Sequence, residues 1–446
     1  MKPVRFLIRE SDEMLVSHGG LAFVGALLRG TALRRRLNAV KLPGKPAPVI
    51  AHGEVLEAMI GLLCLGKPDY EAIEAFRDDE FFKCALGLEQ VPSEGTLRQR
   101  LDEMGLSAEE ILLEESARMV ARHAPAITPC RDGLVALDVD VSPFDNSGTK
   151  KEGVGWTYKQ VDGYAPSFAY LGGEGYLLHT QLRPGTQNCQ KGTPEFLGRV
   201  LGLAGLVTRQ RILVRMDSGN DDIENIRVCR KARADWIIKR NIRRESIAEW
   251  LVEAQAFGEW EFARDGKEVY RGETHRERGG ELHRVVFEVT RRTSLADGQM
   301  LLEPEVEVAT WWTSLKLPAA EVIELYHGHG TSEQFHSELK TDMDLERLPS
   351  GKFATNALVL LLGMFAYNIL RLCGQTALRI DRHLPPDLKA PVRKVAKRRR
   401  LRSVIQDMMY VAAQLVRHAN RWALSFWRSN RWLPNWATTY AVFCMP

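Results

Sequence analysis

The spacing of apolar side chains changes twice along the 446 residues of the chain. Residues 1 to about 128 repeat apolar positions at the spacing of helices that bury one face. From residue 134 to about 240, short apolar runs of strand length alternate with helical segments, and from residue 319 the helical spacing returns almost to the end. The pattern therefore predicts helical N-terminal and C-terminal regions around an α/β core.

The strand-like runs of this core predict a mixed sheet. Three consecutive strands are expected at residues 134–141, 167–171 and 176–182, and the glycine-rich turn between the last two makes them a hairpin. Alternating helices and strands follow, at residues 194–203, 211–216, 223–232 and 235–239. This order is that of a ribonuclease-H-like fold. Residues of about 245–312 then continue as strands without helices, which predicts a β-rich insertion.

Basic residues are clustered, although the whole chain is nearly balanced at 61 basic and 57 acidic side chains. Residues 390–402 hold seven basic side chains and no acidic one, and a second basic cluster lies within residues 29–45. Such clusters attract a polyanion whatever the average charge. They favour DNA contact, and the alternative is a solvated helix face. The candidates for contact in the first cluster are Lys397, Arg398, Arg399 and Arg400.

Two further segments favour nucleic acid. Ser93 follows Pro92 and is placed to cap a basic helix, so a helix-turn-helix would bring Arg98 and Arg100 to DNA, although helical bundles share this pattern. Residues 401–436 interleave tryptophan with arginine, as in a helix that faces DNA or one that packs its tryptophans on the core.

The predicted organisation has three parts. Residues 1–128 form a helical N-terminal DNA-binding region, residues 129–375 form the ribonuclease-H-like domain with its insertion, and residues 376–446 form a basic helical region for DNA contact or dimerisation.

The seven cysteines include no closely spaced pair and no secretory signal pattern begins the chain, so we expect reduced thiols, neither disulfides nor a zinc site, and a cytoplasmic, nucleoid-associated protein. The apolar run 357–370 is too short for a membrane span and predicts a buried helix.

Acidic residues fall where strands and helices of the predicted sheet end or begin. Asp138 and Asp140 are two positions apart on one strand, so their side chains leave the same face. Asp217 follows the strand 211–216, and Glu333 lies in a helix that Thr331 or Ser332 caps. Each acid alone could be a cap, a turn or a surface residue. Together they could converge as the oxygen ligands that Mg²⁺ prefers.

Four segments carry a resemblance to a known family. Residues 137–142 resemble the strand of the first catalytic Asp, residues 163–185 the hairpin that follows, and residues 215–219 the second-Asp motif. Residues 326–340 resemble a Tyr-x2-Arg-x3-Glu-x6-Lys signature, with His329 in place of Arg. From about residue 134 to 433 the chain thus looks like the DDE transposases of bacterial insertion sequences, in the branch that carries a β-rich insertion.

The resemblance implies an activity and a set of site residues. It implies metal-dependent cleavage of DNA at transposon ends and strand transfer into target DNA, with two Mg²⁺ ions, which Mn²⁺ can replace, held by Asp140, Asp217 and Glu333. Asp138 is the reserve for the first position and a further metal ligand. Tyr326, His329 and Lys340 would contact phosphates. Trp311 and Trp312 would stack a flipped base or pack in a strand's core face.

The implied partner is double-stranded DNA at terminal inverted repeats and at the target, bound by a homodimer that bridges two ends, with no membrane partner. Three alternatives stay open from the sequence. They are a ribonuclease-H-like nuclease or resolvase without strand transfer, a decayed transposase that binds DNA as a regulator, and a helical scaffold for protein partners.

Overall fold

A computed structural model describes residues 3–45, 47–131, 133–243, 245–295, 297–391, 396–419 and 421–445. Arg393 and Lys394 of the basic run lie outside these residues. The chain forms two compact units. The terminal unit combines Met1–Arg100 with Ile369–Pro446, and the core unit is Leu101–Asn368. Residues 101–128, expected with the N-terminal region, therefore fold with the core, and the two ends of the chain share one unit.

One nine-stranded sheet organises the core unit, in the order β10-β11-β12-β13-β9-β8-β2-β6-β7. Strand β2 is antiparallel to β6, which is antiparallel to β7, while β8 and β9 run parallel to β2. The five strands β7-β6-β2-β8-β9 thus form the mixed sheet predicted from the sequence, with the strand order of a ribonuclease-H-like fold. Their bounds are β2 Leu134–Val141, β6 Ser167–Leu171, β7 Tyr176–Gln181, β8 Arg211–Met216 and β9 Asp235–Lys239.

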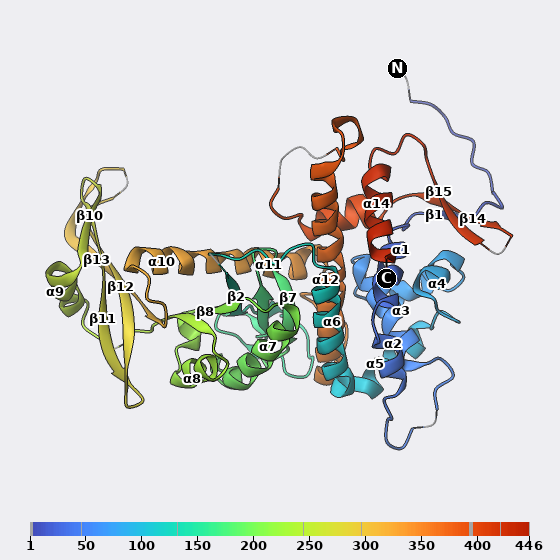
Figure 1. The fold of residues 1–446 in the computed structure, drawn as a ribbon. Helices are drawn as coiled ribbons and strands as arrows, with labels where there is room; N and C mark the ends of the chain where they lie inside the picture. Colours follow the sequence, from blue (N-terminus) through green and yellow to red (C-terminus); the bar gives the residue numbers. More distant parts are fainter. Residues whose placement is uncertain are drawn as a thin grey trace. The chain divides into compact units, whose positions relative to one another are not determined.

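Helices cover both faces of these five strands. Helices α7 (Thr193–Val207) and α8 (Ile223–Lys231) lie on one side, and the segment from α10 (Ala319–His327) to α11 (Ser332–Ser337) lies on the other (Figure 1). Helix α6 (Glu109–His123) packs against α7 and β7. A small sheet of β3 (Phe144–Asp145), β5 (Asp162–Tyr164) and β4 (Gly155–Trp156) completes this part.

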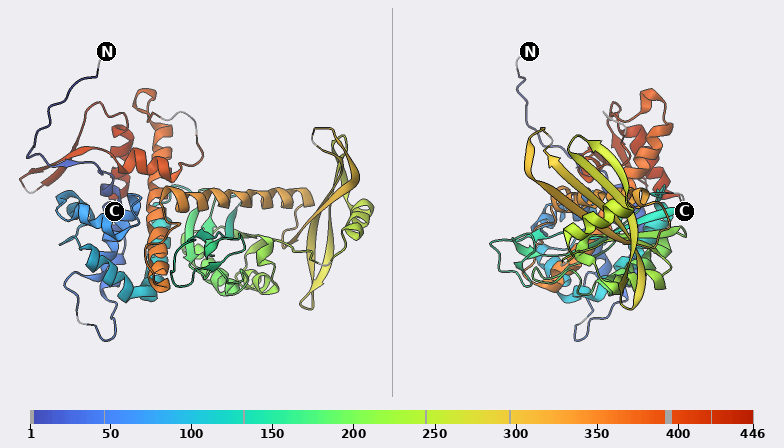
Figure 2. Two further views of the ribbon diagram at one scale, coloured as in Figure 1. Left: turned by 180° about the vertical axis from the view of Figure 1, so that it is seen from behind. Right: turned by 90° about the vertical axis from the view of Figure 1, so that its left-hand side faces the viewer.

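The insertion is β-rich, as expected, but it also contains a helix that the sequence pattern did not predict. Helix α9 (Ile247–Phe257) begins where the Ser246 side chain accepts the Glu249 backbone N–H. Four strands follow: β10 Glu259–Arg264, β11 Lys267–Arg278, β12 Glu281–Ser294 and β13 Met300–Thr313. Figure 2 shows these long strands face on. Since β13 pairs with β9 at Trp311, Trp312 and Thr313, the insertion continues the central sheet.

The segment after α10 carries the signature residues. A 3₁₀ turn, η4 (Gly328–Thr331), leads into α11, and a π-helical turn, η5 (Glu338–Asp342), leads out of it. The 31-residue helix α12 (Phe353–His383) follows. By length and apolar composition α12 could span a membrane, but its most apolar 18-residue window is entirely buried within the protein. The expectation of a buried helix at 357–370 is therefore confirmed.

The terminal unit is helical at its N-terminal side. It contains α1 (Leu21–Arg29), α2 (Leu33–Asn38), α3 (His52–Cys64), η1 (Tyr70–Phe76), α4 (Glu80–Leu86) and the start of α5 (Glu94–Met104). The C-terminal residues of this unit were expected to be helical, and this prediction is wrong for residues 413–426, which form strands. After α13 (Leu401–Val404) and η7 (Ile405–Met409), strands β14 (Ala413–His418) and β15 (Arg421–Phe426) form a hairpin that pairs with β1 (Leu15–Val16). Helix α14 (Leu433–Cys444) ends the unit.

Candidate active site

Neighbouring strands bring the acidic side chains to one face of the central sheet. Asp138 and Asp140 of β2 lie opposite Tyr170 and Phe168 of β6, and Asp138 also pairs in register with Arg215 of β8. Asp217 follows β8 directly and begins the short turn η3 (Ser218–Asn220). The carboxyl ends of β2 and β8 thus place Asp140 and Asp217 at the same edge of the sheet, as predicted.

A pocket of about 580 Å³ opens at this edge, and all three predicted catalytic acids line it. Asp140 comes from β2, Asp217 from the end of β8 and Glu333 from the first turn of α11. The remaining wall is polar and includes two lysines. The full lining is Asp140, Val141, Ser142, Tyr158, Lys159, Asp217, His329, Gly330, Ser332, Glu333, His336, Ser337, Lys340, Thr341 and Glu346.

Asp140 is held by hydrogen bonds from three directions. Its Oδ1 accepts the Val141 backbone N–H at 2.8 Å, and its Oδ2 lies 3.3 Å from Ser332 Oγ and 3.1 Å from His336 Nε2. Burial acts to raise the pKa of this carboxyl. The hydrogen bond from His336, together with the positive charges of His336 and His329 when these rings are protonated in acid, outweighs burial and lowers the pKa to about 2. Asp140 is therefore ionised at neutral pH.

Asp217 has the opposite balance. Burial and the nearby negative charge of Asp140 raise its pKa, and the hydrogen bond from Asn220 Nδ2 to Oδ1, at 2.7 Å, compensates only in part. Two carboxylates that repel each other in a polar pocket are a site where a bound cation would be stabilising.

Glu333 lies at the exposed rim of the pocket. Within the described residues its carboxylate forms no hydrogen bond or ion pair, and no three His, Cys, Asp or Glu side chains there converge closely enough to hold a metal ion as they stand. The chemistry of the donors nevertheless fits divalent cations, since hard carboxylate oxygens line the pocket. Glu333 would have to approach the two aspartates to complete such a site.

Asp138 does not belong to this donor set, which corrects its predicted roles as a metal ligand and as the reserve catalytic acid. Its side chain is buried, and its two oxygens each accept a 2.7 Å hydrogen bond from Arg215, through Nε and Nη2. His329 Nδ1 lies 2.9 Å from Oδ1 of the same carboxylate. The charge of Asp138 is therefore neutralised inside the protein, and Asp138 does not line the pocket.

The signature residues Tyr326, His329 and Lys340 lie close to the pocket, in differing environments. His329 forms part of its wall and is 7 % exposed; burial lowers the pKa of its ring, but the hydrogen bond and charge of Asp138 raise it above the usual value. Lys340 lines the pocket and its Nζ donates to the Pro143 carbonyl. Tyr326 packs on Trp311, at 5.5 Å between ring centroids. Their contact with phosphate stays a prediction.

Two of the arginines predicted to contact DNA are buried, and these predictions are wrong. Arg100 is 8 % exposed and donates to the Ile50 carbonyl at 2.8 Å. Arg399 is 6 % exposed, with its guanidinium 4.4 Å from the Trp432 ring centre. Helix packing, which the basic pattern does not encode, turns both side chains inward. Arg98 pairs with Glu94 and remains largely exposed; DNA contact by it and by Lys397, Arg398 and Arg400 stays a prediction.

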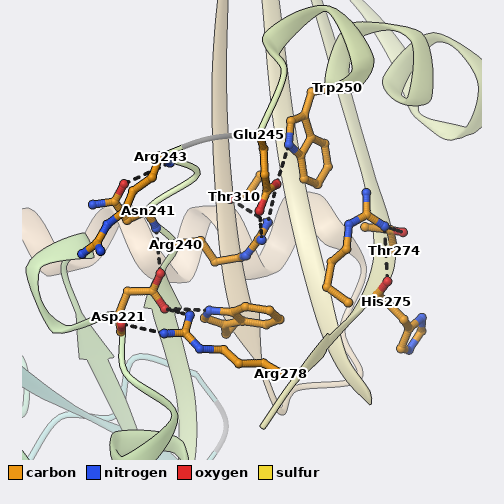
Figure 3. Close-up of polar contacts among 12 residues, drawn as sticks. Asp221, Arg240, Asn241, Arg243, Glu245, Trp250, Thr274, His275, Arg278 and Thr310 are labelled. Atoms are coloured by element: carbon orange, nitrogen blue, oxygen red, sulfur yellow. Dashed lines mark hydrogen bonds and ion pairs between the residues drawn. The ribbon is translucent and has the colours of Figure 1, made fainter. Parts of the chain in front are cut away.

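Trp311 and Trp312 are each 2 % exposed, so the prediction that they stack a flipped base is wrong for this conformation and the core alternative holds. Trp312 Nε1 donates to Asp221 Oδ1 at 2.8 Å, and the guanidiniums of Arg240 and Arg278 lie 4.5 and 5.6 Å from its ring centre. Figure 3 shows Asp221 at the centre of these contacts, between Asn241 and Arg278.

The sequence reasoning missed several residues of the site. Ser332 and His336, which hold Asp140, are four positions apart and therefore share one face of α11. This spacing within the signature segment was the available signal. Tyr158, whose hydroxyl donates to the Val141 carbonyl at 2.8 Å, and Lys159 come from a loop with no recognisable pattern.

Comparisons with known proteins identify the family of the chain. No curated protein sequence matches the chain. A solved structure of the piggyBac transposase in a synaptic complex with hairpin DNA is similar with 9 % sequence identity and a TM-score of 0.39, over 88 % of this chain and 80 % of that one. Residues 5–432, nearly the whole sequence, match the family described as transposase DDE domain, group 1. The chain therefore belongs to the DDE transposase family.

Proposed function

We propose that this chain cleaves DNA at the ends of a mobile element and joins the freed 3′ ends to target DNA, and that the pocket of Asp140, Asp217 and Glu333 is its active site. One observation carries the proposal. Three acids from separate parts of the chain line a single polar pocket, in a chain that belongs to the DDE transposase family. Because the family is one of phosphoryl-transfer enzymes, these acids are its natural catalytic set.

Asp140, Asp217 and Glu333 would hold divalent cations, Mg²⁺ or Mn²⁺. When bound, such ions activate the attacking oxygen and stabilise the charge that develops on the leaving oxygen. The protein's own contribution is to keep Asp140 ionised, which its hydrogen bonds achieve, and to keep Asp217 beside it in spite of their repulsion. Glu333, at the rim, would move toward the two aspartates when DNA and metal bind.

The basic groups of the pocket suit a polyanionic substrate. Lys340 and Lys159 line the same pocket as the acids, so each can place a positive charge near a phosphate oxygen. A lysine contributes a point charge on a flexible stem, which orients a backbone without reading its sequence. Selection of element ends would then depend on the terminal unit, whose exposed candidates are Arg98, Lys397 and Arg400. A homodimer that bridges two ends belongs to this proposal.

The test is a strand-transfer assay. Purified full-length protein is incubated with Mg²⁺, a labelled linear duplex carrying the inverted repeat that flanks its gene, and a supercoiled plasmid. We expect labelled DNA joined to the plasmid, and we expect Asp140→Ala, Asp217→Ala and Glu333→Ala each to abolish joining while DNA binding is retained. Cleavage without joining would replace the proposal by a nuclease, and binding without cleavage by a regulator. Joining by Asp217→Ala at the wild-type rate would refute the site.

A further inference from the structure

The contacts of Asp140 distinguish its two carboxylate oxygens. Among the residues that the structure describes, Oδ2 has two hydrogen-bond neighbours, Ser332 Oγ at 3.3 Å and His336 Nε2 at 3.1 Å, whereas Oδ1 has only the Val141 backbone N–H at 2.8 Å. An ionised carboxylate can only accept hydrogen bonds, so both the serine hydroxyl and the histidine N–H must donate. Since each oxygen has about two acceptor positions, Oδ2 is filled and Oδ1 retains one.

His336 is itself held in one orientation. His336 is 5 % exposed, and its ring packs against both Phe168 and Tyr170, with ring centroids 4.9 and 5.3 Å away. Its second nitrogen, Nδ1, is 3.1 Å from the Tyr170 hydroxyl. Because Nε2 carries the hydrogen that Asp140 accepts, Nδ1 of the neutral ring is the acceptor and the tyrosine donates.

This chain of contacts begins and ends on the central sheet. Tyr170 and Phe168 lie on β6, directly opposite Asp138 and Asp140 of β2, and α11 supplies His336 from above the same face. Strand β6 thus orients the histidine that orients the aspartate on the neighbouring strand. Ser332 and His336 also hold α11 against the sheet at the turn from which Glu333 reaches the pocket rim.

We propose that His336 is a positioning residue: with Ser332 it occupies Oδ2 of Asp140 and so presents Oδ1 as the oxygen available to a divalent cation. The proposal rests on the proposed function, since it assigns a role to Asp140 as a ligand. Groups that orient a metal ligand through a hydrogen bond typically contribute 10- to 100-fold to metal affinity. His336 should therefore influence metal binding without contacting the metal or DNA.

The test measures Mn²⁺ affinity by calorimetric titration of the full-length protein without DNA. We expect His336→Ala to weaken Mn²⁺ binding about 10- to 100-fold. We expect the Mn²⁺ affinity of His336→Gln, whose side-chain amide keeps a donor for Oδ2, to remain much closer to that of wild type. The affinity of Tyr170→Phe should fall between those of His336→Ala and His336→Gln. His283→Ala is the matched control, because His283 is equally buried but belongs to the insertion, where its ring meets the Arg278 carbonyl. It should leave Mn²⁺ affinity unchanged.

The alternatives are separated by fold and by activity. Circular dichroism and metal-free thermal unfolding establish which variants fold. If His336→Ala folds and binds Mn²⁺ like wild type, or if His336→Gln is as weak as His336→Ala, the positioning role is refuted. If His336→Ala does not fold, a large affinity loss in His336→Gln refutes it. If the positioning role is refuted but the wild-type protein cuts DNA, the proposed function stands. If the wild-type protein neither binds Mn²⁺ nor cuts DNA, the positioning role and the proposed function are both refuted.

Discussion

Arg215 and Asp138 are neighbours on parallel strands, and two nitrogens of the guanidinium each donate to a different carboxylate oxygen at 2.7 Å. Both side chains are almost completely buried. Arg215 Nη1 also donates to the Leu325 carbonyl at 2.7 Å, so the same guanidinium joins the sheet to α10, the helix that leads into the signature segment. The pair is therefore a structural connection beside the active site.

Breaking this pair should destabilise the protein strongly. Asp138→Asn leaves the buried Arg215 without a full counter-charge, and removal of one partner of a buried ion pair typically costs about 3–5 kcal/mol. We expect a loss of that size in the free energy of unfolding, measured with urea. Glu224→Gln is the control, since its partner Arg227 is about half exposed and such surface pairs contribute at most about 1 kcal/mol. Equal losses in the two variants would show that the buried pair is dispensable.

Gly175 should tolerate no side chain, for two separable reasons. Its φ of +70° disfavours L-residues, and a Cβ there would lie 2.3 Å from the ring of Phe335 on α11. Gly192 has a similar φ of +77° but open space around it. We expect Gly192→Ala to cost about 1 kcal/mol from backbone strain alone, and Gly175→Ala to cost a further ~1–3 kcal/mol from overpacking.

The same pair of variants should differ in activity. Phe335 precedes His336, so displacing its ring should disturb the contacts of Asp140 and lower the rate of metal-dependent DNA cleavage. Thermal unfolding and cleavage kinetics measure the two effects. If Gly175→Ala behaves like Gly192→Ala in both, the hairpin turn does not constrain the position of α11.

The sequence predicts those parts of the fold that depend on local pattern. Strand β2 begins as an apolar run and carries its two aspartates near its end, and a glycine-rich turn joins β6 to β7, so both were found within a residue or so of their ends. The hairpin β14–β15 was missed because its period of two was interpreted as part of an aromatic helix. The partners of the site are set by long-range packing: Arg215 is 77 positions from Asp138, and His336 is 196 from Asp140. No local pattern reveals such pairs.

The raised pKa of Asp217 leads to a prediction about pH. Burial and the charge of Asp140 place its folded pKa above the ordinary value of 3.8. A group of this kind stabilises the fold fully below its unfolded pKa, and the stabilisation is lost as pH rises through the folded pKa. Without divalent cations, wild type should therefore lose stability relative to Asp217→Asn as pH rises from about 4 toward neutrality. Urea midpoints of the two proteins across this range provide the measurement.

Divalent cations should reverse the effect at neutral pH. Adding Mn²⁺ at pH 7 is expected to raise the midpoint of wild type more than that of Asp217→Asn, because the cation offsets the repulsion between Asp140 and Asp217. If wild type keeps the same midpoint difference from the variant at pH 4 and at pH 7 without the cation, the folded pKa of Asp217 is not raised.

Trp312 supports a prediction that separates a structural role from DNA recognition. Its indole lies between the guanidiniums of Arg240 and Arg278 and donates to the buried carboxylate of Asp221, which leaves no ring face open to a base. Trp312→Phe keeps an aromatic ring but removes the Nε1 donor, so we expect the free energy of unfolding to fall by about 1–3 kcal/mol. Trp427→Phe, at a position 76 % exposed, should change it little.

DNA affinity provides the second measurement on Trp312. Stacking of a base on an aromatic ring is worth about 1–3 kcal/mol, so loss of such stacking would weaken binding by at least several-fold. Because the indole is enclosed, we expect Trp312→Phe and Trp312→Leu to bind a duplex end with wild-type affinity at equal salt, while both are less stable. Since phenylalanine could still stack a base and leucine could not, weaker binding by the leucine variant alone would show that the ring opens to DNA. In that case the side chains of Arg240 and Arg278 would have to move away from the Trp312 ring to expose it.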